Sequence, residues 1–148
     1  VIIEKSGEDC RQFGAICKLA YDSGKLDKIG LDPLMVGGLI DGIIEADVPE
    51  ELIVGIAQGY KLAGHMQTTE RKLAEGTLFH ANQRMMDWCV GNARVEVRGN
   101  NALITKQSSG KSKIDPVIAT FNAASLMALN PEAKGSIGSF IDNMVMIL

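Results

Sequence analysis

The start of a helix stands out at residues 111–119, which read Lys111-Ser112-Lys113-Ile114-Asp115-Pro116-Val117-Ile118-Ala119. Asp followed by Pro and an almost wholly apolar run to Leu129 is typical of a helix N-terminus, with Asp115 as the N-cap. The simplest interpretation is that Asp115 only caps a buried helix. The alternative is that the helix holds this carboxylate rigidly beside the lysines, where it could ligate a hard metal ion.

A second Asp-Pro pair follows the same order. Asp32 comes directly after Lys28-Ile29-Gly30-Leu31, a predicted strand, and precedes Pro33 and an apolar run that predicts a helix over residues 34–46. An N-cap role is again the simplest interpretation. In α/β proteins, ligands also bind where strands end at their carboxyl side, so Asp32 and Asp115 are candidate ligands of one cation. Spacing along the chain does not show that the two meet.

The remaining pattern predicts an α/β fold, because strands alternate with helices. Further helices are expected from a Ser6 N-cap to Tyr21, over residues 61–75 and from residue 82 through 89, and a strand over 52–56. Residues 94–98 and 102–106 predict a hairpin around Gly99-Asn100-Asn101, and residues 77–80 a short extended piece.

Length and composition favour one soluble domain over residues 1–148, with residues 131–148 as a C-terminal tail. The chain has 148 residues, 46% hydrophobic and 22% charged. No apolar run approaches the roughly 20 residues that span a bilayer, and there is no secretion signal, so we expect a cytoplasmic protein without membrane contact. Cys10, Cys17 and Cys89 form no CxxC pair, and with His65 and His80 they make no zinc set.

Positive charge is concentrated in one part of the chain. The net charge is −3, yet residues 94–113 hold five basic residues and a single acid, Glu96. Solvated side chains on a hairpin are one explanation, and contact with the phosphates of a nucleic acid is the other. The candidate DNA-binding residues are Arg94, Arg98, Lys106, Lys111 and Lys113.

Other catalytic motifs are excluded by their missing parts. Gly110-Lys111-Ser112 is not a P-loop, because that motif needs Gly at position 105, where the chain has Thr105. A serine hydrolase is disfavoured because no G-x-S-x-G sequence is present. Cys89 is interpreted as a core residue, since free cysteines are usually buried.

Several motifs in order are similar to those of one protein family, and the likeness covers about residues 13–133. They are Ile29-Gly30-Leu31-Asp32-Pro33, Thr68-Thr69-Glu70-Arg71-Lys72-Leu73-Ala74-Glu75-Gly76-Thr77-Leu78, Trp88-Cys89-Val90-Gly91-Asn92-Ala93 and Lys113-Ile114-Asp115-Pro116. The chain resembles the C-terminal nuclease domain of the terminase large subunits of tailed phages and prophages.

The resemblance implies an RNase H-like fold and an endonuclease that cuts concatemeric phage DNA during packaging, with two Mg²⁺ or Mn²⁺ ions held by acidic residues. Asp32 matches the acid that ends a central strand and Asp115 the last acid. His80 and Asn92 fall where the family shows site-edge residues. Implied partners are double-stranded DNA and, in the full protein, an ATPase domain, the small terminase subunit and the portal, in the cytoplasm of a bacterial host.

One difference from the family leads to two hypotheses about the function of this chain. The family carries a first catalytic Asp on an early strand, followed by a β-meander. We expect that this chain begins after both of these features, and that the ATPase domain of the family also lies before its first residue. The first hypothesis is a two-metal endonuclease with Asp32 and Asp115 as metal ligands. The second is a catalytically incompetent fragment that acts as a folded interaction module, because the missing strand would leave a sheet edge open to pairing.

Overall fold

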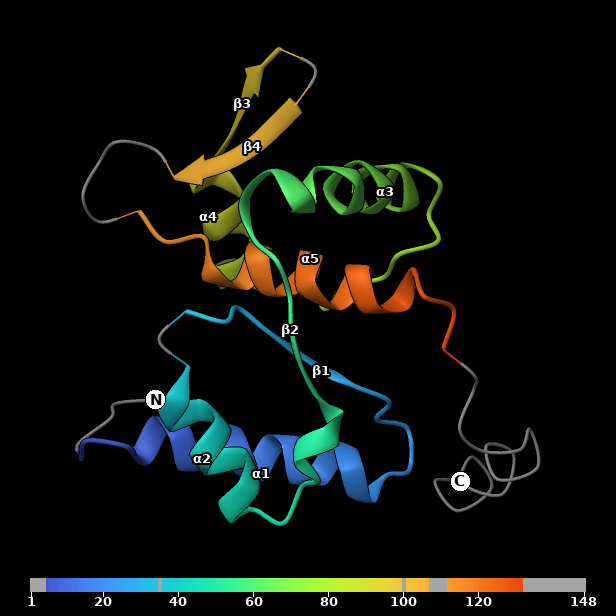
Figure 1. Cartoon of the computed structure of the whole chain (residues 1–148). Coiled ribbons are helices and arrows are strands. Elements are labelled where there is room, and N and C mark those ends of the chain that lie inside the picture. The colour runs from blue at the N-terminus through green and yellow to red at the C-terminus, as the bar shows by residue number, and fades with distance from the viewer. Residues whose placement is uncertain (1–4, 35, 100, 107–111, 132–148) are drawn as a thin grey trace. The chain divides into compact units, whose positions relative to one another are not determined.

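The computed structural model describes residues 5–34, 36–99, 101–106 and 112–131 (Figure 1). Within these residues the chain is mixed α/β, which confirms the predicted class. The elements are α1 (Glu8–Asp22), β1 (Ile29–Leu31), α2 (Gly37–Glu45), η1 (Glu50–Leu52), β2 (Ile53–Gly55), η2 (Gly59–Leu62), α3 (Ala63–Ala74), α4 (Arg84–Asn92), β3 (Ala93–Arg98), β4 (Asn101–Lys106) and α5 (Asp115–Met127), where η marks a 3₁₀ helix.

The internal contacts of the chain divide it into two compact units. The first contains, among the described residues, 5–29, 34, 36–54 and 130–131, and the second contains 30–33, 55–99, 101–106 and 112–129. The chain passes from one unit to the other within β1 and β2, which pair in a two-stranded sheet. The expected single domain stays a prediction, and of its predicted tail, residues 132–148 lie outside the described residues.

The first unit is built on a close approach of α1 and α2. A Cβ atom on Gly14 would overlap the carbonyl oxygen of Gly42, and one on Gly42 would overlap the carbonyl oxygen of Cys10. The two helix backbones therefore touch where both residues lack a side chain. Ile43, next to this contact, is fully buried at 0% exposure. Glycine at positions 14 and 42 is thus a packing requirement of this unit.

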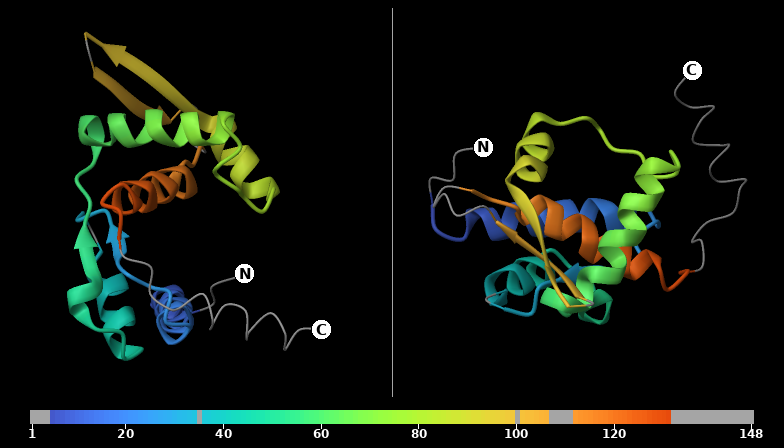
Figure 2. Two further views of the ribbon diagram at one scale, coloured as in Figure 1. Left: turned by 90° about the vertical axis from the view of Figure 1, so that its right-hand side faces the viewer. Right: turned by 90° about the horizontal axis from the view of Figure 1, so that it is seen from above.

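The second unit is built around α5, which packs against both α3 and α4. Val117 and Phe121 of α5 are buried apolar side chains, and Asn122 is a buried polar one. The Nε2 of Gln58 donates to the Oδ1 of Asn122 at 3.1 Å, so the segment after β2 is fixed to the middle of the helix. The hairpin of β3 and β4 projects from the rest of this unit (Figure 2).

The predicted hairpin is confirmed, and its register separates two faces. β3 and β4 are antiparallel, with Ala93 opposite Lys106 and Val95 opposite Ile104. Successive side chains of a strand point to opposite faces, so Val95 and Val97 lie on one face and Arg94 and Arg98 on the other. This alternation gives the hairpin an apolar face and a charged face, on which Glu96 lies between the two arginines.

Several expected boundaries are wrong. Gly7, with a φ of 79°, is the N-cap of α1 in place of Ser6, since a left-handed backbone suits glycine. α2 begins at Gly37, later than expected, and Val36 is its N-cap. The described residues 77–80 form no strand. No helix in the described part of the chain is long and apolar enough to cross a membrane.

Candidate functional site

Asp115 stands at the exposed N-terminus of α5. It is the first helical residue, Pro116 follows in the first turn and Ile114 occupies the N-cap position. The N-cap interpretation of Asp115 is therefore wrong by one residue, because the chain enters the helix one position earlier than the Asp-Pro pattern predicts. The partial positive charge of a helix N-terminus favours a negative group at this position. The carboxylate of Asp115 is thus held by a buried helix yet remains open to solvent.

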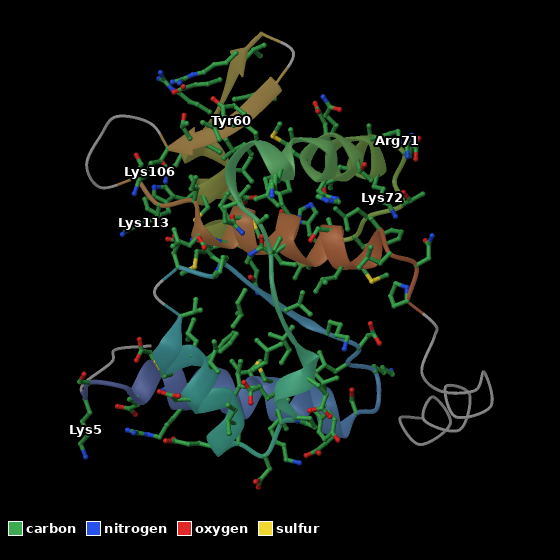
Figure 3. All side chains as sticks on the ribbon, viewed as in Figure 1. Lys5, Tyr60, Arg71, Lys72, Lys106 and Lys113 are labelled. Atoms are coloured by element: carbon green, nitrogen blue, oxygen red, sulfur yellow. The ribbon has the colours of Figure 1, made fainter. Side chains whose placement is uncertain are left out.

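Lys106 and Lys113 both lie beside the C-terminal end of α4. The Nδ2 of Asn92, the last residue of α4, donates to the carbonyl oxygen of Lys113 at 3.2 Å. The next residue, Ala93, pairs with Lys106 at the end of β4. Figure 3 shows Lys106 and Lys113 on the same side of this unit. Asn92 therefore lies beside the segment that leads into Asp115, where the resemblance expected a site-edge residue.

The arginines of the hairpin differ in their surroundings. The Nη2 of Arg98 lies 3.2 Å from the Oε2 of Glu96, and the Oε1 of Glu96 accepts a hydrogen bond from the hydroxyl of Thr105 at 3.0 Å. Glu96 therefore offsets part of the charge of Arg98. Arg94 lies on the same exposed face, closer along the strand to Asn92. Lys111, another predicted DNA-binding residue, lies outside the described residues.

Asp32 is half-buried and follows the end of β1. The carbonyl of Leu31, just before it, accepts a hydrogen bond from the backbone N–H of Ile56 at 2.7 Å. The N-cap interpretation is wrong for Asp32 as well, since Val36 is the N-cap of α2. The predicted position of Asp32 at a strand end is confirmed.

β1 also contacts α5, the helix that carries Asp115. A Cβ on Gly30 would lie 3.0 Å from the Cδ1 of Leu126. Leu126 is eleven residues after Asp115, about 16 Å along the helix axis. Both acidic residues thus belong to the second unit, and their meeting at one cation stays a prediction.

His80 belongs to the turn that begins α4. Its Nδ1 accepts a hydrogen bond from the backbone N–H of Asn82 at 3.2 Å, and Asn82 has a φ of 50°. The imidazole is exposed and lies on the rim of an apolar groove. A local structural role is thus shown, and a site-edge role for His80 stays a prediction.

The donor chemistry at Asp32 and Asp115 fits a small hard cation. Among the residues that the structure describes, no three His, Cys, Asp or Glu side chains form a group that could hold a metal ion. Mg²⁺ needs fewer protein ligands, because it is usually bound through one or two carboxylates and keeps several waters. Asp32 and Asp115 could therefore hold Mg²⁺ or Mn²⁺ as a site completed by water and substrate.

The cysteines are poorly suited to such chemistry. Partial burial, together with the negative charge of Asp9, raises the pKa of the Cys10 thiol above its ordinary 9.0, and burial raises the pKa of Cys17. A thiol with a raised pKa holds little thiolate, the form that attacks substrates and binds metals. Cys89 is 1% exposed, which confirms its interpretation as a core residue.

Sequence reasoning missed an open apolar groove in the second unit. The groove has a volume of about 1040 Å³, and its walls come from α3, residues 78–80, α4, the apolar face of the hairpin and α5. The exposed fractions of Phe79, Val95 and Val97 are 87%, 57% and 74%. The alternation of Ala93, Val95 and Val97 was a signal for it, because one apolar face of a hairpin needs a covering surface.

Comparison with known proteins finds relatives among bacteriophage proteins. Both relatives are terminase large subunits: that of Lactococcus phage p2 is 32% identical to the chain over 98 residues, and that of Lactococcus phage SK1 is 31% identical over 98 residues. No family model and no solved structure matches the chain. The chain is therefore similar to part of the terminase large subunits of two phages, the kind of protein that the ordered motifs suggested. Each match covers 64% of this chain and 18% of the relative, so the chain corresponds to a small part of such a subunit.

Proposed function

We propose that this chain belongs to the nuclease domain of a phage terminase large subunit, has an RNase H-like arrangement and takes part in cutting concatemeric DNA during genome packaging. The similarity to two terminase large subunits supports the packaging role. The ordered motifs around Asp32 and Asp115 support the nuclease assignment, because one acid ends a strand and the other opens a buried helix.

The observation that carries the proposal is the hydrogen bond from Asn92 to the carbonyl of Lys113. This bond, together with the pairing of Ala93 with Lys106, brings the backbone of two lysines to the end of α4, beside the segment that leads into the exposed Asp115. Lysines that contact phosphates fix the position of a nucleic acid without reading its sequence. The arrangement therefore suits a phosphodiester backbone drawn toward an acidic residue.

Each side chain then has a stated role. Asp32 and Asp115 would hold the divalent ions, Mg²⁺ or Mn²⁺. When bound, a pair of such ions activates water and stabilises the leaving oxygen in phosphodiester hydrolysis. Lys106 and Lys113 position the DNA backbone, and Asn92 fixes the segment that carries Lys113. Double-stranded DNA is the proposed substrate, and an ATPase domain, a small terminase subunit and a portal are the proposed partners of the full protein.

Cleavage of supercoiled plasmid in the presence of Mn²⁺ tests the proposal. We expect Asp115→Asn and Asp32→Asn each to lower the rate by about 100-fold or more, because each removes a charged ligand from the ions that supply the chemistry. Asp41→Asn is the matched control, since Asp41 is an exposed acid on α2 in the first unit. Cleavage by Asp115→Asn at the wild-type rate would show that the proposed site is wrong.

A non-cutting interaction module is the second candidate. It is favoured by the finding that, within the described residues, no three potential ligands form a metal-holding group. Titration of Mn²⁺ by calorimetry beside the cleavage assay separates the two functions. Metal binding with cleavage supports the nuclease, whereas a folded chain that neither binds Mn²⁺ nor nicks DNA supports the module.

A further inference from the structure

α4 presents a tryptophan to solvent on the side that does not line the apolar groove. The groove is lined by Asp87, Val90 and Gly91 of this helix. Trp88 is 51% exposed and Met85 is 69% exposed, and neither lines the groove. Tryptophan is on average a highly buried residue, so a half-exposed tryptophan beside an exposed methionine is a candidate contact surface. The covered half of Trp88 anchors the ring, while the open half can meet a ligand.

Trp88 lies one helical turn from the contact that positions Lys113. Arg84, Trp88 and Asn92 are four residues apart in α4, so they follow one another along one side of the helix. Side chains at this spacing have Cβ atoms about 5–6 Å apart. The amide of Asn92 donates to the carbonyl oxygen of Lys113 at 3.2 Å. Trp88 therefore lies near the segment that leads into Asp115.

Positive charge lies on both sides of Trp88. Arg84 is exposed one turn before it. Lys106 and Lys113, both exposed, lie beside the other end of α4 (Figure 3). Within the described residues, the ion pairs involve none of these three side chains, so their charge is open to a ligand. Asp87, the acid of α4, lines the groove instead.

An exposed aromatic ring between basic side chains is the arrangement with which proteins bind single-stranded nucleic acid. The cations follow the phosphates, and a base stacks on the ring whatever its sequence. In a duplex the bases are already stacked on one another, so only an unpaired base can reach a protein ring. An apolar protein segment would gain nothing from the flanking cations. The charges therefore favour a nucleic-acid strand as the ligand.

We propose that Trp88 is a stacking platform for an unpaired base of single-stranded DNA, with Lys106, Lys113 and Arg84 at the phosphates on either side. An opened or frayed end of a duplex supplies such a base. This inference extends the DNA-binding surface of the proposed function and rests on its lysines. It needs neither metal nor cleavage, so binding experiments without divalent ions address it separately.

The fluorescence of the unmodified chain tests the stacking directly, because Trp88 is its single tryptophan. An oligothymidine of about 12 nucleotides lies within the usual site size of such surfaces, and it is titrated into the chain without divalent ions. We expect saturable quenching of the tryptophan emission, because a stacked base quenches indole fluorescence. A blunt duplex of the same length is the control, and it should quench far less since its bases are paired.

Substitutions separate stacking from simple burial of apolar surface. Anisotropy of a labelled oligothymidine measures the affinity. We expect Trp88→Ala and Trp88→Leu each to weaken binding about tenfold, as the loss of one stacked base does, and Trp88→Phe to retain most of the affinity. Phe79→Ala is the matched control, because Phe79 is an 87% exposed aromatic residue at the groove, and it should bind as the wild type does.

The outcomes distinguish this inference from the proposed function. If Lys113→Gln weakens DNA binding while oligothymidine leaves the Trp88 emission unchanged, the DNA surface stands and the stacking platform is wrong. Equal quenching by the duplex, or equal affinities of Trp88→Ala and Phe79→Ala, also contradicts the platform. Absence of binding to either form of DNA would overturn both proposals. Trp88 emission that changes with protein concentration alone would assign this face to a second copy of the chain and so overturn the platform.

Discussion

At the scale of single residues, Asn92 links two elements through one side chain. Its amide donates to the carbonyl of Lys113, and the same residue ends α4. We expect Asn92→Ala to lower the free energy of unfolding by about 0.5–1.5 kcal/mol, the usual net worth of one hydrogen bond. It should also weaken DNA binding, because the segment that carries Lys113 loses its anchor.

Urea denaturation and fluorescence anisotropy with labelled duplex DNA measure the two effects of Asn92→Ala. Gln12→Ala is the matched control, since Gln12 is an exposed amide on α1. Unchanged DNA affinity for Asn92→Ala would separate Asn92 from the proposed DNA-binding site.

The thiol of Cys10 gives a pH-dependent prediction. Burial and the charge of Asp9 raise its pKa above 9.0, so below that pH the reactive thiolate is scarcer than in free cysteine. We expect iodoacetamide to modify Cys10 more slowly than free cysteine at pH 8, with a rate that still rises above pH 9. Asp9→Asn removes a negative charge that disfavours the thiolate, so it should lower the pKa and speed the reaction. Equal rates for Asp9→Asn and wild type at pH 8 would contradict this account.

At the scale of elements, the contact of α1 with α2 depends on glycine. Gly14→Ala would drive a Cβ into the carbonyl of Gly42, and overpacking of this kind costs about 1–3 kcal/mol. Gly64→Ala is the control, because a Cβ on Gly64 of α3 would meet nothing within 4 Å. In an exposed helix this change should stabilise by about 0.5–1 kcal/mol. Thermal unfolding of both variants measures the contrast, and equal stability would mean that the two helices do not touch there.

Much of the element order could be predicted from local pattern. The apolar spacing predicted α1, α3, α4 and α5, and the two runs around Gly99 predicted the hairpin. The helix starts were less predictable, since Gly7 and Ile114 take the N-cap positions that Ser6 and Asp115 were expected to fill. Capping preferences indicate which residue types suit the N-cap position. Tertiary packing determines at which residue the backbone enters the helix.

At the scale of the whole molecule, a net charge of −3 coexists with a basic region in the second unit. Each phosphate contact that is lost lowers the slope of log affinity against log salt by about 0.9. We expect Lys106→Gln and Lys113→Gln each to reduce that slope by about one contact, and Lys72→Gln to leave it unchanged. Figure 3 shows Lys72 toward the end of α3 remote from Lys106 and Lys113. Equal slopes for all three variants would mean that DNA contacts this unit without a preferred face.

The candidate site could be predicted only in part. The Asp-Pro pairs marked Asp32 and Asp115, because strand ends and helix starts are visible in sequence. The bond between Asn92 and Lys113 depends on how α4 meets the start of α5, which no spacing encodes. The apolar groove also depends on tertiary packing, since its walls come from segments far apart in the chain.

The most direct test of the central claim, that Asp32 and Asp115 share a divalent cation, is a Mn²⁺ titration of the ¹⁵N-labelled chain. Bound Mn²⁺ broadens nearby amide signals. We predict that the signals of Asp32 and Asp115 broaden together and saturably, and that Asp115→Asn abolishes the broadening at Asp32. Broadening at only one of them, or at Asp32 to the same extent in Asp115→Asn, would contradict a shared site.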